Sequence, residues 1–274
     1  MHSKNNIEIY EHTKKICREL NFPPEPSVKY DYGSPHFSDY FIFDQIPSPN
    51  YVPLIIVENI DSFDMARKII TYETKNSDTI IPDSNTTDNK KILVLNLASF
   101  MRSGGGVERG CKAQEEDLYR KSNYFQANNH NFYPLRKSQV VYSPTVHIIK
   151  DSDYNLLDKP VAVSCLAVAA LKNPPLFKMT GMRQHYKNDI DRNTMQAKID
   201  MIFKVAILHK HTDLVLGALG CGVYNNPRVE VALMFKKSIQ KYGKYFRRIG
   251  FAILSSGDSS NSNFNIFKKI LSTI

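Results

Sequence analysis

Two hydrophobic periods alternate along this chain, and the alternation constrains its fold more than any other feature. Short runs rich in branched residues have the length of strands, and between them apolar residues recur at helical spacing. Several of the short runs lack the polar alternation of a half-exposed strand, as buried and mostly parallel strands do. The pattern predicts an α/β protein whose sheet is covered by helices on both faces. The predicted strands are 54–57, 92–95, 139–142, 161–168, 214–216 and 251–254.

Length and local composition predict one domain with an N-terminal extension. With 274 residues and 42% hydrophobic content, the chain can bury one large core. Residues 1–50 are predicted to pack on the body as an extension, with a helix over 5–20 and then a proline-rich, aromatic arm. Residues 51–274 are predicted to form the domain. Within it, 195–207 and 231–242 are predicted helices, and 75–91 is a predicted exposed polar loop.

The charge balance favours polyanionic partners without choosing among them. The formal net charge is +9, from 36 lysines and arginines against 27 aspartates and glutamates, and the pI is about 9.2. Such an excess attracts nucleic acid, but equally any other phosphate-rich polymer. Basic pairs such as Lys236-Lys237 and Arg247-Arg248 are spread along the chain, so no basic stripe stands out.

Cysteine usage and the absence of long apolar stretches predict the compartment. The four cysteines lie far apart without a CxxC pair, which argues against both a zinc site and a disulfide framework. The first 15 residues lack the apolar core of a signal peptide, and no stretch approaches the roughly 18 apolar residues of a membrane span. We therefore expect a cytoplasmic or nuclear protein, without a membrane partner.

A triglycine, Gly104, Gly105 and Gly106, follows the strand predicted at 92–95. Each glycine loses more conformational freedom on folding than any other residue, so three in a row indicate that something approaches this backbone closely. Bare amides before a helix can cradle a phosphate. Glu115 and Glu116 beyond them carry the same sign as a phosphate. They are therefore expected to serve another part of the ligand, or to be solvated at the start of a helix.

A second glycine-rich loop, GALGCGVYNNP at 217–227, follows the strand predicted at 214–216. In open sheets of this kind ligands bind beyond the carboxyl ends of the strands. Two backbone-lined loops at one sheet edge could hold a diphosphate between them. The alternative is that Gly217, Gly220 and Gly222 only permit a tight turn from strand to helix.

Two better-known glycine motifs do not fit. GGVERGCK at 105–112 resembles a P-loop, but Cys111 stands where the phosphate-binding lysine belongs, and no Ser or Thr follows Lys112 to hold magnesium. Hydrolysis of a nucleoside triphosphate is therefore not expected. The spacing of the second loop is not GxGxxG either, so a Rossmann assignment is weak.

The two loops together resemble the poly(ADP-ribose) glycohydrolases. In that family a GGG is followed after seven residues by QEE, and this chain has Gly104–Gly106, then 107–113, then Gln114-Glu115-Glu116. The loop at 217–227 resembles the family's diphosphate loop. The likeness covers about residues 50–270 and is closest to the shorter, microbial type. It implies a macrodomain-like, three-layer α/β/α fold with a mixed central sheet, and an enzyme that needs neither a metal nor another cofactor.

The resemblance also implies roles for single residues. Glu116 would protonate the leaving ribose and then activate water, Glu115 would hold a ribose hydroxyl, and Gln114 would support both. Tyr224 would lie over the terminal ribose. Further ligand-binding residues implied or suggested by the motifs are Asn96, Ser99, Gly104, Gly105, Gly106, Val107, Gly217, Gly220, Cys221, Gly222 and Val223, with Ile60 and Phe251 on the adenine side.

The chemistry agrees with a carboxyl group as the working side chain. Breaking a ribose–ribose O-glycosidic bond needs a proton for the departing oxygen, and a carboxylic acid supplies it. Adjacent glutamates are expected to point in different directions, so one of them must do most of the proton transfer. Ser99 stands where relatives have asparagine, and a serine cannot form the two-sided hydrogen bonds of an amide.

These observations predict a monomeric glycosidase that hydrolyses poly(ADP-ribose) and releases ADP-ribose. Two alternatives stay open. One keeps the fold but makes the protein an ADP-ribose reader, or a hydrolase of ADP-ribose attached to protein or nucleic acid. The other is a non-enzymatic nucleic-acid-binding protein that uses its positive surface.

Overall fold

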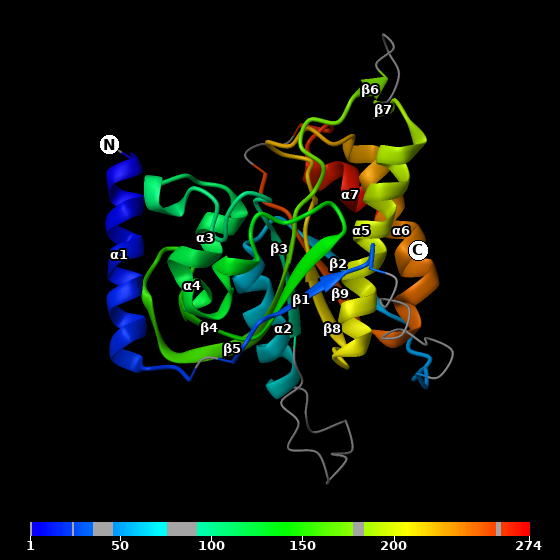
Figure 1. Ribbon diagram of the computed structural model, residues 1–274. Coiled ribbons are helices and arrows are strands. Elements are labelled where there is room, and N and C mark those ends of the chain that lie inside the picture. Colours follow the sequence, from blue (N-terminus) through cyan, green and yellow to red (C-terminus); the bar gives the residue numbers. More distant parts are fainter. Residues whose placement is uncertain (1, 24, 35–45, 76–91, 178–183, 256–258) are drawn as a thin grey trace.

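A computed structural model describes residues 2–23, 25–34, 46–75, 92–177, 184–255 and 259–274, and it contains a seven-stranded mixed sheet at its centre. The strand order is β1-β4-β5-β3-β8-β9-β2 (Figure 1). The strands are β1 (Val28–Asp31), β2 (Leu54–Glu58), β3 (Ile92–Leu97), β4 (Gln139–Lys150), β5 (Leu156–Val168), β8 (Asp213–Leu216) and β9 (Arg248–Ala252). A two-stranded ribbon, β6 (Leu176–Phe177) with β7 (His185–Tyr186), stands apart from it.

The sheet is parallel on one side and antiparallel on the other. From β5 through β3, β8 and β9 to β2 every pair is parallel, whereas β1 with β4 and β4 with β5 are antiparallel. The parallel strands β3 and β8 are buried along nearly their whole length. Their continuous apolar composition is the consequence of helices on both faces.

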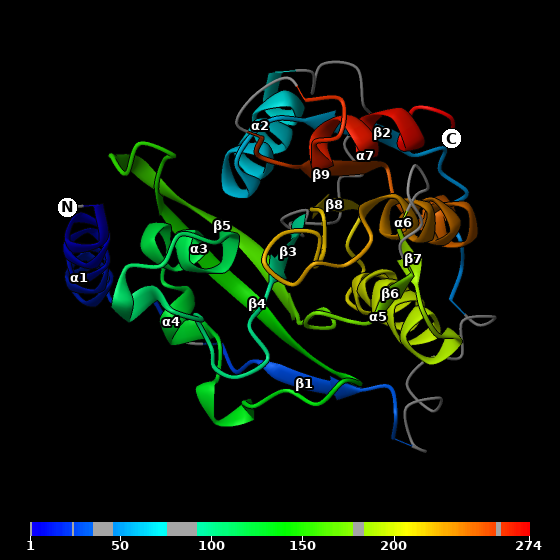
Figure 2. The ribbon, with the colours of Figure 1, turned by 90° about the horizontal axis from the view of Figure 1, so that it is seen from above.

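Helices form a layer on each face of the sheet (Figure 2). One core cluster joins the sheet to α5 (Asp189–Leu208), α6 (Arg228–Tyr242) and α7 (Asn263–Leu271). The other joins it to α2 (Ser62–Lys75), α3 (Gln114–Lys121) and α4 (Tyr124–Ala127). The three-layer α/β/α fold with a mixed sheet is therefore as predicted.

The N-terminal helix α1 (His2–Leu20) lies outside α3 and α4, as both views show (Figures 1 and 2). Polar side chains attach it: Asn6 Nδ2 donates to the Gly110 carbonyl at 3.0 Å, and Thr13 Oγ1 donates to the Arg120 carbonyl. The buried Lys150 ammonium donates to Ile9 O at 3.1 Å and to Thr13 Oγ1 at 2.8 Å. α1 thus braces the segment that carries the triglycine and α3.

The predicted strands are all present, with shifted ends. β4 and β5 are much longer than predicted, and β9 begins three residues before the predicted run and ends two residues earlier. β1 lies inside the predicted extension and pairs with β4, so residues 1–50 contribute an edge strand to the sheet. The predicted loop at 75–91 lies outside the described residues from 76 on. Of the predicted arm at 21–37, residues 21–23 and 25–34 are described and include β1, whereas residues from 35 on lie outside the described part.

Candidate active site

The loops after β3 and β8 border one cavity of about 620 Å³. β3 and β8 are adjacent parallel strands, with Ile92 opposite Asp213 and Val94 opposite Val215, so their carboxyl ends meet at the same sheet edge. Seen from above, the loop between β8 and α6 lies next to α3 (Figure 2). The predicted site residues that line the cavity are Ser99, Gly105, Gly106, Gln114, Glu115, Glu116, Gly220, Gly222, Val223 and Tyr224.

Gln114 begins α3 and ties this helix to the end of β3. Its Oε1 accepts the Leu97 N–H at 2.9 Å, and its Nε2 donates to the Leu95 carbonyl at 2.8 Å and to Ser62 Oγ at 3.1 Å. The amide thereby extends the hydrogen bonding of the strand across to the helix. The two glutamates that follow are placed by this attachment.

The Glu115 carboxyl is buried and accepts three N–H donors. Oε2 accepts from the Ser99 amide at 2.7 Å, and Oε1 accepts from Asn96 Nδ2 and from the Gly104 amide, each at 3.2 Å. Burial raises the pKa of Glu115 to about 8, while the three donors and the nearby Glu116 act in opposite directions on it. The Glu115 carboxyl is therefore held in one orientation and is suited to positioning a bound molecule.

The Glu116 carboxyl is buried too, but it is held on one side only. Oε1 accepts the Gly106 amide at 2.8 Å. Oε2 has no hydrogen-bond partner among the described residues. Glu116 therefore keeps one carboxyl oxygen that no donor of the described residues engages, which distinguishes it from Glu115.

The triglycine loop does not work as predicted. The Gly104 and Gly106 amides donate to the two glutamates, and the Gly105 amide donates to the Arg102 carbonyl at 3.2 Å. No N–H of the three glycines is left for a phosphate, so the prediction of a phosphate cradle in this loop is wrong. The prediction of divergent glutamates is wrong as well, because both carboxyls turn toward Gly105.

Close approach is what the triglycine permits. A β-carbon on Gly105 would lie 2.4 Å from Glu116 Oε1 and 3.0 Å from Glu115 Oε2, and this residue has φ +55°. On Gly104, with φ +75°, it would lie 2.7 Å from the Tyr119 ring. Both positions require glycine, by conformation and by space. The groups that approach the triglycine backbone closely are therefore the carboxyls of Glu115 and Glu116.

The loop at 217–227 does leave amides free. Among the described residues, the N–H groups of Gly220, Gly222, Val223 and Tyr224 have no acceptor, whereas the neighbouring Cys221 amide donates to the Ala218 carbonyl. All four residues with free amides line the cavity. Several convergent N–H groups on a concave surface form an anion site.

Asn226 holds this second loop in shape. Its buried Nδ2 donates to the carbonyls of Leu171, Gly220 and Tyr224 at 2.7, 3.1 and 3.2 Å, and its Oδ1 accepts from the Tyr186 hydroxyl at 2.8 Å. The loop's carbonyls are thus turned toward Asn226. Its amides are consequently free to face the cavity.

Tyr224 connects the two loops. Burial raises the pKa of its hydroxyl, while the Phe100 backbone and the Ser99 side chain, which bond to it, act to lower that pKa. Ser99 is one of the predicted ligand-binding residues. Here it contacts the aromatic side chain across the cavity.

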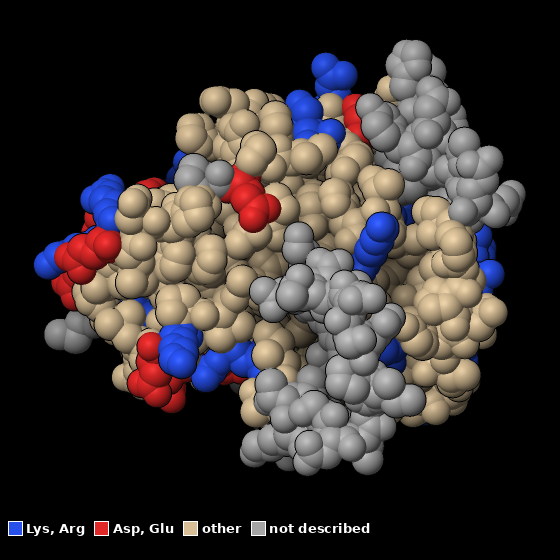
Figure 3. Space-filling view, turned by 90° about the horizontal axis from the view of Figure 1, so that it is seen from below, with Lys and Arg blue, Asp and Glu red and all other residues tan. Residues whose placement is uncertain are grey.

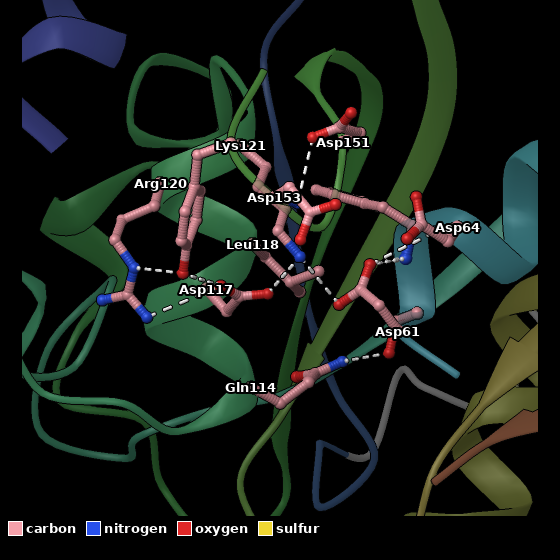
Figure 4. A network of polar contacts seen from close by, with 12 residues as sticks. Asp61, Asp64, Gln114, Asp117, Leu118, Arg120, Lys121, Asp151 and Asp153 are labelled. Carbon is pink, nitrogen blue, oxygen red and sulfur yellow. Dashed lines mark hydrogen bonds and ion pairs between the residues drawn. The ribbon is translucent and has the colours of Figure 1, made fainter. Parts of the chain in front are cut away.

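The outer side of α3 is fixed by buried charges (Figure 4). Lys121 lies between two carboxylates, 3.0 Å from Asp61 Oδ2 and 2.5 Å from Asp117 Oδ2. Burial disfavours the ammonium, but Asp61 and Asp117 outweigh it and raise the pKa of Lys121. Arg120 donates to the Tyr154 hydroxyl at 3.1 Å, and that hydroxyl donates to Asp117 Oδ1 at 2.5 Å. α3 therefore cannot rotate without breaking ion pairs, which keeps its glutamates facing the cavity.

Comparison with known proteins identifies the family. Residues 5–151 match the family described as the microbial-type PARG catalytic domain, and this match covers more than half of the chain. The chain belongs to this family. The matched residues include the triglycine and QEE, and they end before the loop at 217–227.

Solved structures support the fold of this PARG family member over nearly its whole length. Poly(ADP-ribose) glycohydrolase from Thermomonospora curvata aligns with a TM-score of 0.75 and 20% identity, over 97% of this chain and 99% of that one. The same protein bound to the inhibitor ADP-HPD gives a TM-score of 0.72 and 20% identity over the same shares. The Deinococcus radiodurans enzyme in complex with ADP-ribose gives 0.70 and 22%, over 90% of this chain and 94% of that one. A comparison with curated protein sequences gives no significant match.

Other predicted site residues of this PARG family member lie outside the cavity lining. Phe251 is fully buried and packs edge-on against the Phe235 ring at 5.3 Å between centroids, so it is a core residue and offers no face to adenine. Ile60 packs against the core around α2. Burial raises the pKa of the Cys221 thiol to about 12, as expected for an inert cysteine. Asn96, Gly104, Val107 and Gly217 are also buried and support the wall from behind.

Three basic residues of the site were missed by sequence reasoning. Arg102, Arg109 and Lys112 line the cavity, and none of them makes an ion pair within the described ranges. Their position between the end of β3 and Gln114 was a signal, since a cavity that binds a phosphate gains from nearby cations whichever loop supplies the amides. They add positive charge to the cavity that the free amides also line.

In the described ranges, no three His, Cys, Asp or Glu residues gather as metal ligands would. None of the described helices is long and apolar enough to cross a membrane. On the face seen from below, basic side chains lie in small groups with acidic ones among them, over the part of that face that is described (Figure 3).

Proposed function

We propose that this protein is a poly(ADP-ribose) glycohydrolase, which hydrolyses the ribose–ribose O-glycosidic bonds of the polymer and releases ADP-ribose. One observation carries the proposal: the unpartnered oxygen of Glu116 belongs to a residue that lines the same cavity as four free amides. An anion site next to a proton donor is what a diphosphate attached to a scissile sugar requires.

The diphosphate binds at the second loop in this proposal. The free N–H groups of Gly220, Gly222, Val223 and Tyr224 supply its hydrogen bonds. Arg102 and Lys112, which line the same cavity, supply positive charge. The ADP-ribose complex of the related Deinococcus radiodurans enzyme supports this choice of ligand.

Glu116 then carries out both proton transfers. Its protonated carboxyl gives the proton to the departing ribose oxygen while the bond from that oxygen to the anomeric carbon breaks. The carboxylate that remains takes a proton from water, whose oxygen attacks the oxocarbenium-like carbon, and the acid is regenerated. The bound diphosphate offsets the positive charge of that carbon.

Glu115 and Tyr224 position the sugar. The Glu115 carboxyl is fixed by three donors and remains an acceptor for a ribose hydroxyl at the same wall. Tyr224 covers the sugar from the opposite loop, beside Ser99. Because Gly105 brings both carboxyls against its backbone, the reacting group and the positioning group act on neighbouring atoms.

Glu116→Gln tests the proposal with labelled poly(ADP-ribose). The amide has nearly the shape of the acid but cannot transfer a proton, so kcat is expected to fall at least about 10²-fold, while the variant still binds the polymer. Glu108→Gln is the matched control, since Glu108 lies in the same loop with an exposed side chain and does not line the cavity.

The rival functions give other results. If the protein were a reader, wild type would leave the polymer intact, and wild type and Glu116→Gln would bind the polymer equally well. A hydrolase of single ADP-ribose groups would release them from protein while leaving the ribose–ribose bonds of the polymer intact. A nucleic-acid-binding protein would prefer an oligonucleotide to poly(ADP-ribose) of equal charge. Each of these results would contradict the proposal.

A further inference from the structure

A second cavity, of about 450 Å³, lies beside the first. Ala170 lines both of them, and Phe100 in the second directly follows Ser99 in the first. The two are also joined through the backbone, because the Asn173 amide in the second cavity donates to the Tyr224 carbonyl at 2.9 Å. The second cavity therefore lies next to the part of the first cavity that Ser99 and Tyr224 line.

Lys198 of α5 lines this second cavity and is only 2% exposed. No hydrogen bond or ion pair holds its ammonium within the described part of the chain. Burial lowers the pKa of Lys198 to about 8, and repulsion from Lys137 adds to the effect. A buried ammonium without a partner is unfavourable, so the group lacks the counter-charge that would stabilise it.

The other charges around the cavity are also mainly positive. Arg136, Lys137 and Lys172 are exposed at its rim, and none forms an ion pair within the described residues. Among the described residues that line it, Asp191 is the only one with a carboxylate, and Asn188 Nδ2 donates to that carboxylate at 2.9 Å. Four cations against one acid make this a site for an anion.

The uncharged residues of the lining indicate which chemical groups are attached to the anion. Apolar walls are given to the cavity by Phe100, Leu135, Pro174 and Pro175. Phosphate alone would need no such walls. A nucleoside that bears a phosphate fits both features, with a base or sugar against the apolar side and the phosphate at the lysine.

We propose that this cavity binds the phosphate-bearing ADP-ribose unit next to the one that is released, with Lys198 as the counter-ion of its phosphate. The inference rests on the proposed function, because it places the neighbouring unit beyond the bond cleaved at Glu116. It makes Lys198 a residue that selects a polymer over a single ADP-ribose group.

The test compares two substrates with wild type and Lys198→Met. One is poly(ADP-ribose), and the other is ADP-ribose that carries a neutral aryl leaving group on its distal ribose. For the polymer, Lys198→Met is expected to raise KM about tenfold, or about 1.4 kcal/mol, with kcat unchanged. For the aryl substrate, kcat/KM should not change, because no phosphate reaches Lys198.

Controls separate this inference from the proposed function. Lys198→Gln must raise KM for the polymer and leave the aryl substrate unaffected, as Lys198→Met does. Lys237→Met, which removes an exposed lysine of α6, must change neither substrate's kinetics. Equal effects of Lys198→Met on both substrates, or no effect on either, would overturn the inference while leaving the hydrolase intact. Failure of wild type to cleave either substrate would overturn the proposed function instead.

A competitor identifies the source of the phosphate. An RNA oligonucleotide with the same number of phosphates as the polymer should compete poorly, and its inhibition constant should not depend on Lys198. Inhibition as strong as that by the polymer, and lost in Lys198→Met, would overturn the assignment in favour of an RNA site.

Discussion

The two glycine-rich loops of this protein border the same cavity, yet they are held in opposite ways. In the first loop, the Gly104 and Gly106 amides are used by Glu115 and Glu116 of the protein itself. In the second, Asn226 takes up the carbonyls and leaves the amides free. Similar composition therefore serves different purposes. The first loop places a pair of acids, and the second presents donors to an anion.

The difference has a steric counterpart. A β-carbon on Gly105 would collide with the Glu116 carboxyl, whereas one on Gly222 would meet no atom within 4 Å. Gly105 also has a positive φ, and Gly222 does not. Glycine is thus required at Gly105 by the folded protein. At Gly222 it is required only if a ligand comes close to the backbone.

Gly105→Ala, in the first loop, is expected to cause the largest loss of activity. The new methyl group displaces the Glu116 carboxyl, so kcat should fall at least about 10²-fold, while the positive φ should lower the free energy of unfolding by about 1–2 kcal/mol. Steady-state kinetics on poly(ADP-ribose) and urea unfolding measure the two quantities.

Gly222→Ala is the matched variant in the other loop. Its free energy of unfolding should stay within about 0.5 kcal/mol of wild type, since nothing surrounds the new methyl group. KM should rise, because the methyl group keeps a phosphate away from the free amides. If Gly222→Ala lowered kcat as much as Gly105→Ala does, the two loops would not differ in the way we describe.

The sequence predicted that these loops meet, but not how their amides are used. Runs of buried branched residues identified β3 and β8, and loops that follow parallel strands lie at one sheet edge whatever the order of the strands. The direction of the Glu115 and Glu116 side chains depends on how α3 is attached at Gln114 and at Lys121. Those contacts join α2, α3 and β3, and no local pattern reveals them.

The sequence also could not predict the surroundings of Lys198, although it did show that this lysine is unusual. It lies between Met195 and Ile199 on the apolar face of a helix that was predicted correctly. A charged residue inside such a face was visible in the sequence. Whether it would have a partner, as Lys121 has in Asp61 and Asp117, depends on the neighbouring elements.

Asn226→Asp tests how the second loop is held. The carboxylate can still accept the Tyr186 hydroxyl, but it cannot donate to the carbonyls of Leu171, Gly220 and Tyr224. The free energy of unfolding should fall by about 2–4 kcal/mol, because buried carbonyls lose their donor. Asn225→Gly, in the exposed neighbouring residue with φ +53°, should stay near wild type. Equal stability of the two variants would mean that the loop keeps its shape without Asn226.

The first loop should also give the free energy of unfolding a pH dependence, through Glu115. The pKa of Glu115 is about 8 in the folded protein and has its ordinary value of 4.5 in the unfolded chain. Between these values the folded state keeps a proton that the unfolded state has lost, so the free energy of unfolding falls as the pH rises. The slope from this group is at most about 1.4 kcal/mol per pH unit. Urea unfolding of wild type and Glu115→Gln from pH 4.5 to 8 measures it, and subtracting the two curves removes the contributions of titrating groups that do not interact with Glu115. Glu108→Gln should keep the wild-type slope. Parallel curves for wild type and Glu115→Gln would mean that the three N–H donors outweigh burial and keep this carboxylate charged.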